Sequence, residues 1–126
     1  MPETAQSLLA AANAVVPRIS AADAAALAQA GNVLFVDVRD GTEVAASGKV
    51  AGAVHVARGG LESRACLESP TRLAVFDPAK TIITYCAGGG RAAMAGKTLK
   101  DMGYPDVRNL GGFKDWVAAG GAVDKA

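Results

Sequence analysis

The run Val33–Val38 (VLFVDV) is apolar along almost its whole length and rich in β-branched side chains. A glycine and an asparagine precede it, and Arg39, Asp40 and Gly41 follow it. Such a run predicts a strand that is buried on both faces, which is typical of parallel sheets. Parallel strands need long crossover connections, usually helices, so this run restricts the chain to few architectures.

The segments around this run alternate between strand and helix patterns. Strands are predicted at Arg18–Ile19, Ala53–Val56, Thr81–Tyr85 and Val107–Leu110, and helices at Thr4–Val15, Ala21–Gln29, Thr42–Ala46, Arg91–Met102 and Phe113–Ala119. Thr81–Tyr85 has the composition of the most central strand. This alternation predicts an α/β fold, with a small parallel β-sheet of four to five strands flanked by helices on both faces.

The stretch Glu62–Pro78 fits neither pattern and is longer than most connections. We therefore expect a long loop that covers the functional site or contacts a partner. No internal repeat or linker divides the chain, so we predict an N-terminal helical extension over residues 1–17 and a single domain over 18–126. Leu8, Leu9, Ala12 and Val15 form the predicted apolar face of the extension.

Charge and hydropathy exclude several classes of partner. The formal net charge is +1 and no long run of like charges occurs, so neither nucleic acid nor a membrane is expected as a partner. No apolar stretch approaches the roughly 20 residues that span a bilayer. The first residues contain Glu3 and no basic residue before Arg18, which is unlike a secretory signal, so we expect a cytoplasmic protein.

The chain has two cysteines, Cys66 and Cys86, and one histidine, His55. Two cysteines do not make a disulfide framework, and a single histidine leaves an unusual ligand set for zinc. We therefore expect no metal and no cofactor, and a reduced protein with two thiols.

Cys86 ends a predicted central strand, Gly88, Gly89 and Gly90 follow, and Arg91 opens a predicted helix. Glycines let successive backbone N–H groups point inward and form an anion-binding nest. The helix start adds unpaired N–H groups and the positive end of its dipole. These donors favour the thiolate of Cys86, the nucleophilic form of a thiol. The predicted site is therefore Cys86 with the loop Ala87, Gly88, Gly89, Gly90 and Arg91. The Arg91 side chain either adds a charge to the loop or points away and pairs with a carboxylate.

With these residues in place, the chain strongly resembles the rhodanese family over about Ile19 to Val123. The resemblance rests on Asp37-Val38-Arg39 with Glu43, on Gly48 to Val56, on the loop Cys86 to Arg91, on Gly103-Tyr104, and on Val107 to Trp116. It implies a single-domain rhodanese-like fold and a sulfurtransferase of the thiosulfate type. In this family the loop cysteine takes the outer sulfur of a donor as a persulfide and passes it to cyanide or a thiol.

The resemblance leaves other functions open. A persulfide relay to a sulfur-accepting protein would use the same cysteine chemistry. A non-catalytic binding module often lacks the loop cysteine, so Cys86 argues against it. Cysteine-dependent phosphatases have a loop one residue longer than the four residues between Cys86 and Arg91. Ala87 and Ala92 stand where many family members have Arg and Ser or Thr, which leaves the preferred donor open.

A few further residues are candidates for lesser roles. Arg58 is expected at the same sheet edge as Cys86, where it contacts an anionic donor or pairs with Glu62. Cys66 is either a resolving thiol or an ordinary loop cysteine. Structural roles are expected for the remaining polar or aromatic candidates, namely Asp37, Arg39, His55 and Trp116.

Overall fold

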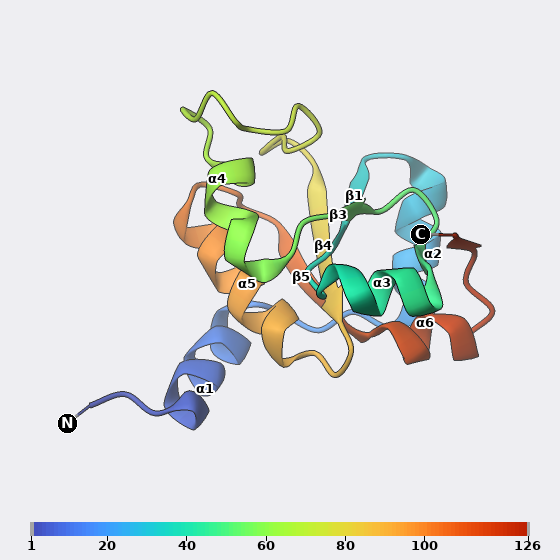
Figure 1. The fold of residues 1–126 in the computed structure, drawn as a ribbon, viewed down its shortest axis with the longest axis horizontal. Coiled ribbons are helices and arrows are strands. Elements are labelled where there is room, and N and C mark those ends of the chain that lie inside the picture. The colour runs from blue at the N-terminus through green and yellow to red at the C-terminus, as the bar shows by residue number, and fades with distance from the viewer. Residues whose placement is uncertain (1, 126) are drawn as a thin grey trace.

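The centre of the fold is a four-stranded parallel sheet in the order β3-β1-β4-β5 (Figure 1). The computed structural model describes residues 2–125. The strands are β1 (Val33–Asp37), β3 (Val54–His55), β4 (Thr81–Cys86) and β5 (Val107–Gly112). Each lies where the sequence predicted a strand, and β4 is one of the two inner strands, as expected. The predicted strand at Arg18–Ile19 is reduced to an isolated bridge between Arg18 and Asn109.

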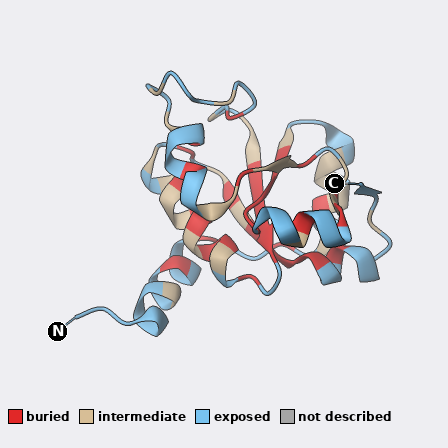
Figure 2. Cartoon of the chain, in the orientation of Figure 1, coloured by how far each residue is buried: buried red, intermediate tan, exposed pale blue. Residues whose placement is uncertain are grey.

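Helices cover both faces of this sheet, which confirms the predicted fold class. Helices α4 (Leu61–Ala65) and α5 (Gly90–Asp101) pack on one face, and α2 (Ala21–Ala30) and α6 (Phe113–Ala118) on the other. Helix α3 (Gly41–Ser47) follows β1. Side chains of β4 alternate between the faces, so Ile82 and Cys86 join the core under α5, while Ile83 and Tyr85 join the other core. Figure 2 shows the resulting buried centre between exposed helix surfaces.

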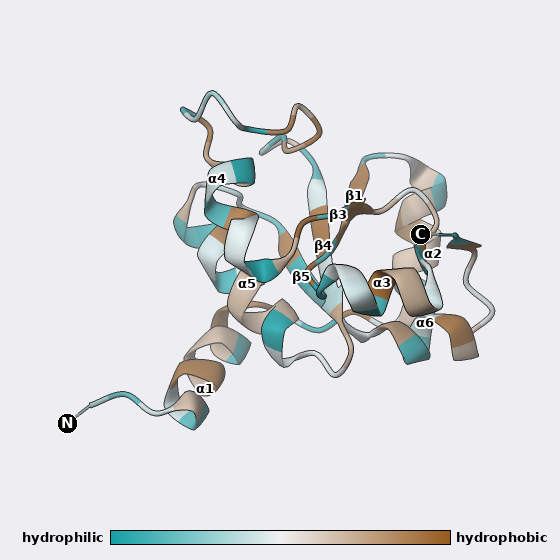
Figure 3. Ribbon diagram, in the orientation of Figure 1, coloured by the Kyte–Doolittle hydropathy of each residue, from teal (hydrophilic) through white to brown (hydrophobic). Residues whose placement is uncertain are grey.

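Helix α1 (Ala5–Val15) begins at a capping box between Thr4 and Ser7 and packs against α5. Ala12 and Val16 are buried in this contact, but Leu8 and Val15 are exposed. The predicted apolar face is therefore only partly covered, and Figure 3 shows that part of α1 has hydrophobic residues. The boundary between an extension at 1–17 and a domain at 18–126 stays a prediction.

Four short elements were not predicted. They are the 3₁₀ turn η1 (Arg58–Gly60), helix α4, and an antiparallel pair of β2 (Lys49–Val50) with β6 (Val123–Asp124). Each has at most five residues, too few for a helical or alternating pattern to stand out. The β2–β6 pair also joins distant parts of the chain, which local sequence does not encode.

The expected long loop differs from its prediction in both structure and position. Its first residues form α4, and the remainder leads into the amino end of β4. The loop therefore lies at the amino ends of the strands, opposite to the turn that follows Cys86, as Figure 1 shows. Phe76 anchors it by packing edge-on against Tyr104 in the core. Of the two expected roles, covering the site was wrong, and contact with a partner stays a prediction.

The structure also bears on membrane insertion. Among the helices of residues 2–125, none is both long and apolar enough to span a bilayer.

Candidate active site

Cys86 is the last residue of β4, and the loop after it leads directly into α5. The residue is buried, and its side chain lies on the α5 face of the sheet. Its Sγ accepts a hydrogen bond from the backbone N–H of Gly89 at 2.9 Å. The loop therefore curls back toward the sulfur, as the glycine-rich sequence predicted.

Gly89 holds the loop in this shape. Its φ of +99° lies in the left-handed region, which glycine adopts without the steric cost that a side chain adds. Its carbonyl accepts a hydrogen bond of 3.0 Å from the side-chain amide of Asn109 on β5. The Asn109 Oδ1 in turn accepts one of 2.8 Å from the N–H of Gly111. Asn109 is buried and holds Gly89, whose N–H donates to the sulfur.

No individual role was predicted for Asn109. The available signal was an amide side chain inside an otherwise buried strand, because such a group needs partners when it is buried. Its partner on the loop lies 20 residues away. Only the parallel pairing of β4 and β5 brings the two together.

Gly112 lets the loop pass close to β5. A Cβ atom at this position would overlap the carbonyl oxygen of Ala87. A register shift in the β4–β5 ladder, between Thr84 and Tyr85, precedes this approach. The glycines of β5 thus set the path of the loop as much as its own glycines do.

The amino end of α5 completes the loop. Because α5 begins at Gly90, its first N–H groups have no carbonyl partner within the helix, and its dipole is positive there. The Thr84 hydroxyl donates to the carbonyl of Ala92 at 2.9 Å and ties this helix start to β4. The arrangement can stabilise an anionic sulfur at Cys86 with backbone donors alone.

The Arg91 side chain pairs with Glu43 of α3, through contacts of 2.7 and 2.9 Å to the two carboxylate oxygens. This pairing is the second of the two arrangements left open by the sequence. It lowers the pKa of Glu43 to about 2, mainly through the hydrogen bonds from Arg91, and raises the pKa of Arg91. Arg91 therefore braces α3 against the start of α5, while its backbone belongs to the loop.

Arg58 does lie at the same edge as the loop, as expected. It lines one groove together with Gly90 and Arg91. Its guanidinium donates to Glu62 and to the Thr98 hydroxyl, both at 3.0 Å. The predicted pairing with Glu62 is thus present, and Arg58 also lines the groove beside the loop.

Asp37 and Arg39 form a buried ion pair with a contact of 2.8 Å. Arg39 also donates to the carbonyl of Gly48 at 2.7 Å and lies over the ring of Phe113. The hydrogen bonds that Arg39 donates to the Asp37 carboxylate raise the pKa of Arg39. The pair therefore holds the β1–α3 turn against Gly48 and Phe113. This is the kind of structural role that was predicted for both residues.

His55 and Trp116 also have structural contacts. A ring nitrogen of His55 lies 2.7 Å from the carbonyl oxygen of Arg39. The indole N–H of Trp116 donates to the carbonyl of Ala122, and its ring packs against Phe35. Neither residue is part of the loop around Cys86.

The structure does not bring Cys66 to Cys86, and both thiols are free. Cys66 lies beside Met102, just past the carboxyl end of α5, whereas the Cys86 loop leads into its amino end. A helix of this length separates its ends by roughly 17 Å. Within residues 2–125, no three His, Cys, Asp or Glu side chains gather in a way that could hold a metal ion.

Comparisons with known proteins agree with this geometry. The family model described as rhodanese-like domain matches residues 20–119. No curated protein sequence gave a significant match.

Solved structures extend the similarity to nearly the whole chain. A protein of unknown function from Rhodopseudomonas palustris, described as a possible tyrosine phosphatase, is 38% identical, with a TM-score of 0.86 over 98% of this chain and 99% of its own. The polysulfide-sulfur transferase homodimer of Wolinella succinogenes is 33% identical, with a TM-score of 0.74 over 94% of this chain and 85% of its own. A human single-domain sulfurtransferase is 26% identical, with a TM-score of 0.67 over 82% of this chain and 96% of its own.

The family match covers most of the chain, and the structural neighbours include sulfurtransferases. The chain belongs to the rhodanese-like domain family.

Proposed function

We propose that this protein is a sulfurtransferase that moves a sulfane sulfur from a thiosulfate-like donor to cyanide or a thiol through a persulfide on Cys86. The observation that carries the proposal is the position of the Cys86 sulfur. It lies inside the loop Ala87–Arg91, at the positive end of α5, and accepts a hydrogen bond from Gly89.

The proposed reaction uses the Cys86 sulfur in that position. The Cys86 thiolate attacks the outer sulfur of the donor, and a new S–S bond forms at Cys86. The bond within the donor breaks, and sulfite leaves with its electron pair when the donor is thiosulfate. The product at Cys86 is again an anion, so the same N–H donors stabilise it. An acceptor then attacks the outer sulfur and regenerates the thiolate.

The loop supports both half-reactions because its donors belong to the backbone and need not move. Gly89 is held by Asn109, and the start of α5 is held by Thr84 and by the Arg91–Glu43 pair. A persulfide needs a reduced thiol to form on, so the proposal places the protein in a reducing compartment such as the cytoplasm.

A protein partner that gives or takes the sulfur is compatible with the same chemistry. The Cys86 site would then serve as a persulfide relay, with a protein thiol as the acceptor. A non-catalytic binding module is less well supported, because such a role would not require a buried cysteine with a hydrogen bond to its sulfur.

Phosphatase activity is the competing proposal, because one similar protein is described as a possible tyrosine phosphatase. Phosphatases need a cradle for a tetrahedral phosphate, whereas only four residues separate Cys86 from Arg91 here. The Arg91 guanidinium is also occupied by Glu43. Both observations favour a single sulfur atom as the bound group. Hydrolysis of p-nitrophenyl phosphate by the native chain would reverse this preference.

Intact mass measurement tests the proposal directly. Reduced native protein is incubated with thiosulfate, or with 3-mercaptopyruvate, alongside Cys86→Ser. We expect the native chain to gain the mass of one sulfur atom and to lose it on addition of cyanide, and the variant to gain nothing. Equal sulfur uptake by Cys86→Ser would contradict the assigned nucleophile. No uptake from either donor would leave a partner-fed relay or a binding module as the better description.

A further inference from the structure

Two carbonyl groups of the loop between β4 and α5 face β5. The Gly89 carbonyl accepts a hydrogen bond of 3.0 Å from the side-chain amide of Asn109 and one of 2.9 Å from the N–H of Ala93. The Ala87 carbonyl lies so close to Gly112 that a Cβ atom there would overlap its oxygen. The loop therefore keeps both oxygens on the side of β5.

The direction of these carbonyls also sets the direction of two N–H groups. Within residues 2–125 every peptide bond is trans, and in a trans peptide the carbonyl and the next N–H point in opposite directions. The N–H of Gly90 and the N–H of Gly88 therefore point away from β5. Cys86 ends the neighbouring strand β4, and its sulfur already accepts a hydrogen bond from Gly89, between these two donors.

The two hydrogen-bonding groups of Gly89 belong to different peptides. Its N–H, which donates to the Cys86 sulfur, belongs to the peptide that joins it to Gly88. Its carbonyl belongs to the peptide that joins it to Gly90. Rotation about the ψ angle of Gly89 therefore turns the Gly90 N–H and leaves the Gly89 N–H in place, and glycine is free to rotate in this way. The Asn109 amide opposes the rotation, together with the first hydrogen bond of α5.

Asn109 is itself held on three sides. Its backbone N–H donates to the carbonyl of Pro17 at 2.9 Å, and its carbonyl accepts from the N–H of Ile19 at 3.0 Å. Its side-chain oxygen accepts from the N–H of Gly111 at 2.8 Å. Because the residue is also buried, its amide N–H can serve only the Gly89 carbonyl.

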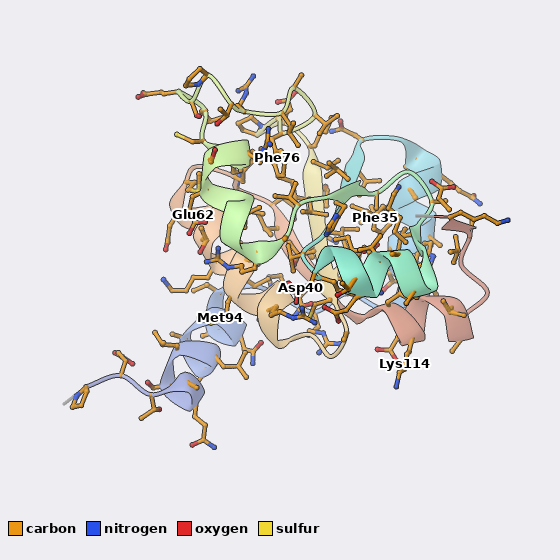
Figure 4. The ribbon with its side chains drawn as sticks, viewed as in Figure 1. Phe35, Asp40, Glu62, Phe76, Met94 and Lys114 are labelled. Atoms are coloured by element: carbon orange, nitrogen blue, oxygen red, sulfur yellow. The ribbon has the colours of Figure 1, made fainter. Side chains whose placement is uncertain are left out.

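Charged side chains do not replace the peptide donors of the loop. The Arg91 guanidinium is paired with Glu43 at 2.7 Å. Lys114, just past the end of β5, is exposed, and Figure 4 shows its side chain pointing away from the body of the molecule. An anion in the loop therefore depends on the direction of the backbone N–H groups.

We propose that Asn109 is a positioning residue that aims the Gly90 N–H at the outer sulfur of the Cys86 persulfide, while the Gly89 N–H stays with Sγ. This inference rests on the proposed function. On loading, the thiolate attacks the outer sulfur of thiosulfate, the S–S bond of thiosulfate breaks, and sulfite leaves with the electron pair. The site holds one sulfur before this step and two after it. Asn109 therefore stabilises the persulfide more than the thiolate.

The test measures the equilibrium of sulfur loading by intact mass, with thiosulfate and sulfite both present at a fixed ratio. Asn109→Leu is similar in shape and removes both side-chain hydrogen bonds. Asn109→Asp keeps an acceptor for Gly111 but has no N–H for Gly89. A result common to both variants comes neither from the new charge nor from the Gly111 bond. Asn32→Leu is the matched control, because the Asn32 amide donates to the carbonyl of Ala79 at 2.9 Å, at the amino end of β1.

We expect both Asn109 variants to lower the equilibrium constant for loading about tenfold, because a hydrogen bond to an ionised group is misaligned in the product. Alkylation of reduced Cys86 by iodoacetamide, which needs only the thiolate, should stay within about threefold of the native rate in Asn109→Leu. Asn32→Leu should match native protein in both measurements. A residue that only stabilised the fold would move the two measurements together.

The glycine amides give a second measurement, which needs no Asn109 variant. In native protein labelled with ¹⁵N-glycine, the Gly90 amide proton resonance should move downfield when Cys86 gains sulfur, because a hydrogen bond to an anion deshields the proton. Gly90→Ala identifies this resonance, since a Cβ atom at Gly90 meets nothing within 4 Å and its φ is not positive. The movement should be smaller in Asn109→Leu.

The failures are distinguishable. If native protein gains no sulfur, the proposed function fails and the inference fails with it. If native protein loads but both folded Asn109 variants keep its equilibrium constant, or lose loading and alkylation to the same extent, only the inference is overturned. If the variants do not fold, the Gly90 resonance of native protein decides. A resonance that stays in place on loading overturns the inference, and one that moves downfield upholds it.

Discussion

At the scale of single residues, the site depends on side chains that position the loop without touching the sulfur. Asn109 holds the carbonyl of Gly89, and Glu43 holds the guanidinium of Arg91. Both partners come from elements other than the loop. The charge that the sequence suggested for the loop is thus largely balanced by Glu43, and the sulfur relies on backbone donors.

The Arg91–Glu43 pair predicts a pH dependence of stability. The pKa of Glu43 falls from its ordinary value of 4.5 to about 2 in the folded chain, so the unfolded chain binds more protons between these values. The contribution of the pair should be complete above about pH 5 and should disappear as the pH falls toward 2. Because the pair is partly exposed, we expect it to contribute at most about 1 kcal/mol.

Denaturant unfolding of native protein and Glu43→Gln at several pH values checks this prediction. The native chain should be the more stable at pH 7, and the difference should shrink as the pH falls from 5 to 3. A difference that is unchanged at pH 3 would show that the carboxylate charge is not its source.

At the scale of elements, the docking of α1 on α5 depends on a small residue in α5. A Cβ atom at Gly96 would lie 2.9 Å from one methyl group of Val16 and 3.0 Å from the other. Glycine within a helix costs stability relative to alanine, so its presence here is explained by the close approach of the two elements. The same contact leaves Leu8 and Leu9 at the groove beside the Cys86 loop.

Gly96→Leu should therefore separate α1 from α5. We expect a loss of about 1–3 kcal/mol in the free energy of unfolding, because the new side chain overpacks the contact with Val16. Trypsin should also cleave faster after Arg18. Lys97→Leu serves as the control, since it introduces the same side chain at a more exposed position of α5. If both variants behave alike, close packing at Gly96 is not what holds α1.

At the scale of the whole molecule, the parallel sheet keeps the candidate active site apart from the long loop, because the two lie at opposite ends of its strands. The candidate active site lies at the carboxyl ends of the strands, where ligands bind in open α/β sheets. The segment 66–80 lies at the other edge, with Cys66 beside Met102. Residues 66–80 therefore stabilise the core around Phe76 and do not close the site.

This separation predicts that Cys66 takes no part in sulfur transfer. Cys66→Ser should load sulfur from thiosulfate and release it to cyanide at the native rates, within about twofold, because the two cysteines lie toward opposite ends of α5, a helix roughly 17 Å long. Intact mass after mild oxidation provides the second measurement. An intramolecular disulfide between Cys66 and Cys86 in native protein would contradict the prediction.

Features that are encoded in contiguous residues could be predicted before the structure was known. The strands around Val33–Val38 and Thr81–Tyr85 were predictable because a strand buried on both faces must be apolar throughout. The loop Cys86–Arg91 was recognisable because a curled backbone needs adjacent glycines and a helix start. For Arg58 and for Arg91, two alternative roles were predicted, and the local sequence could not decide between them.

Contacts between groups that are distant in the chain became visible only in the folded molecule. Glu43 lies 48 residues from Arg91, and Asn109 lies 20 residues from Gly89. The groove beside the loop requires α1 and α5 to pack at Gly96, and the place of residues 66–80 follows from the direction in which β4 runs. Each of these outcomes depends on contacts between elements, for which the local pattern of residue types carries no signal.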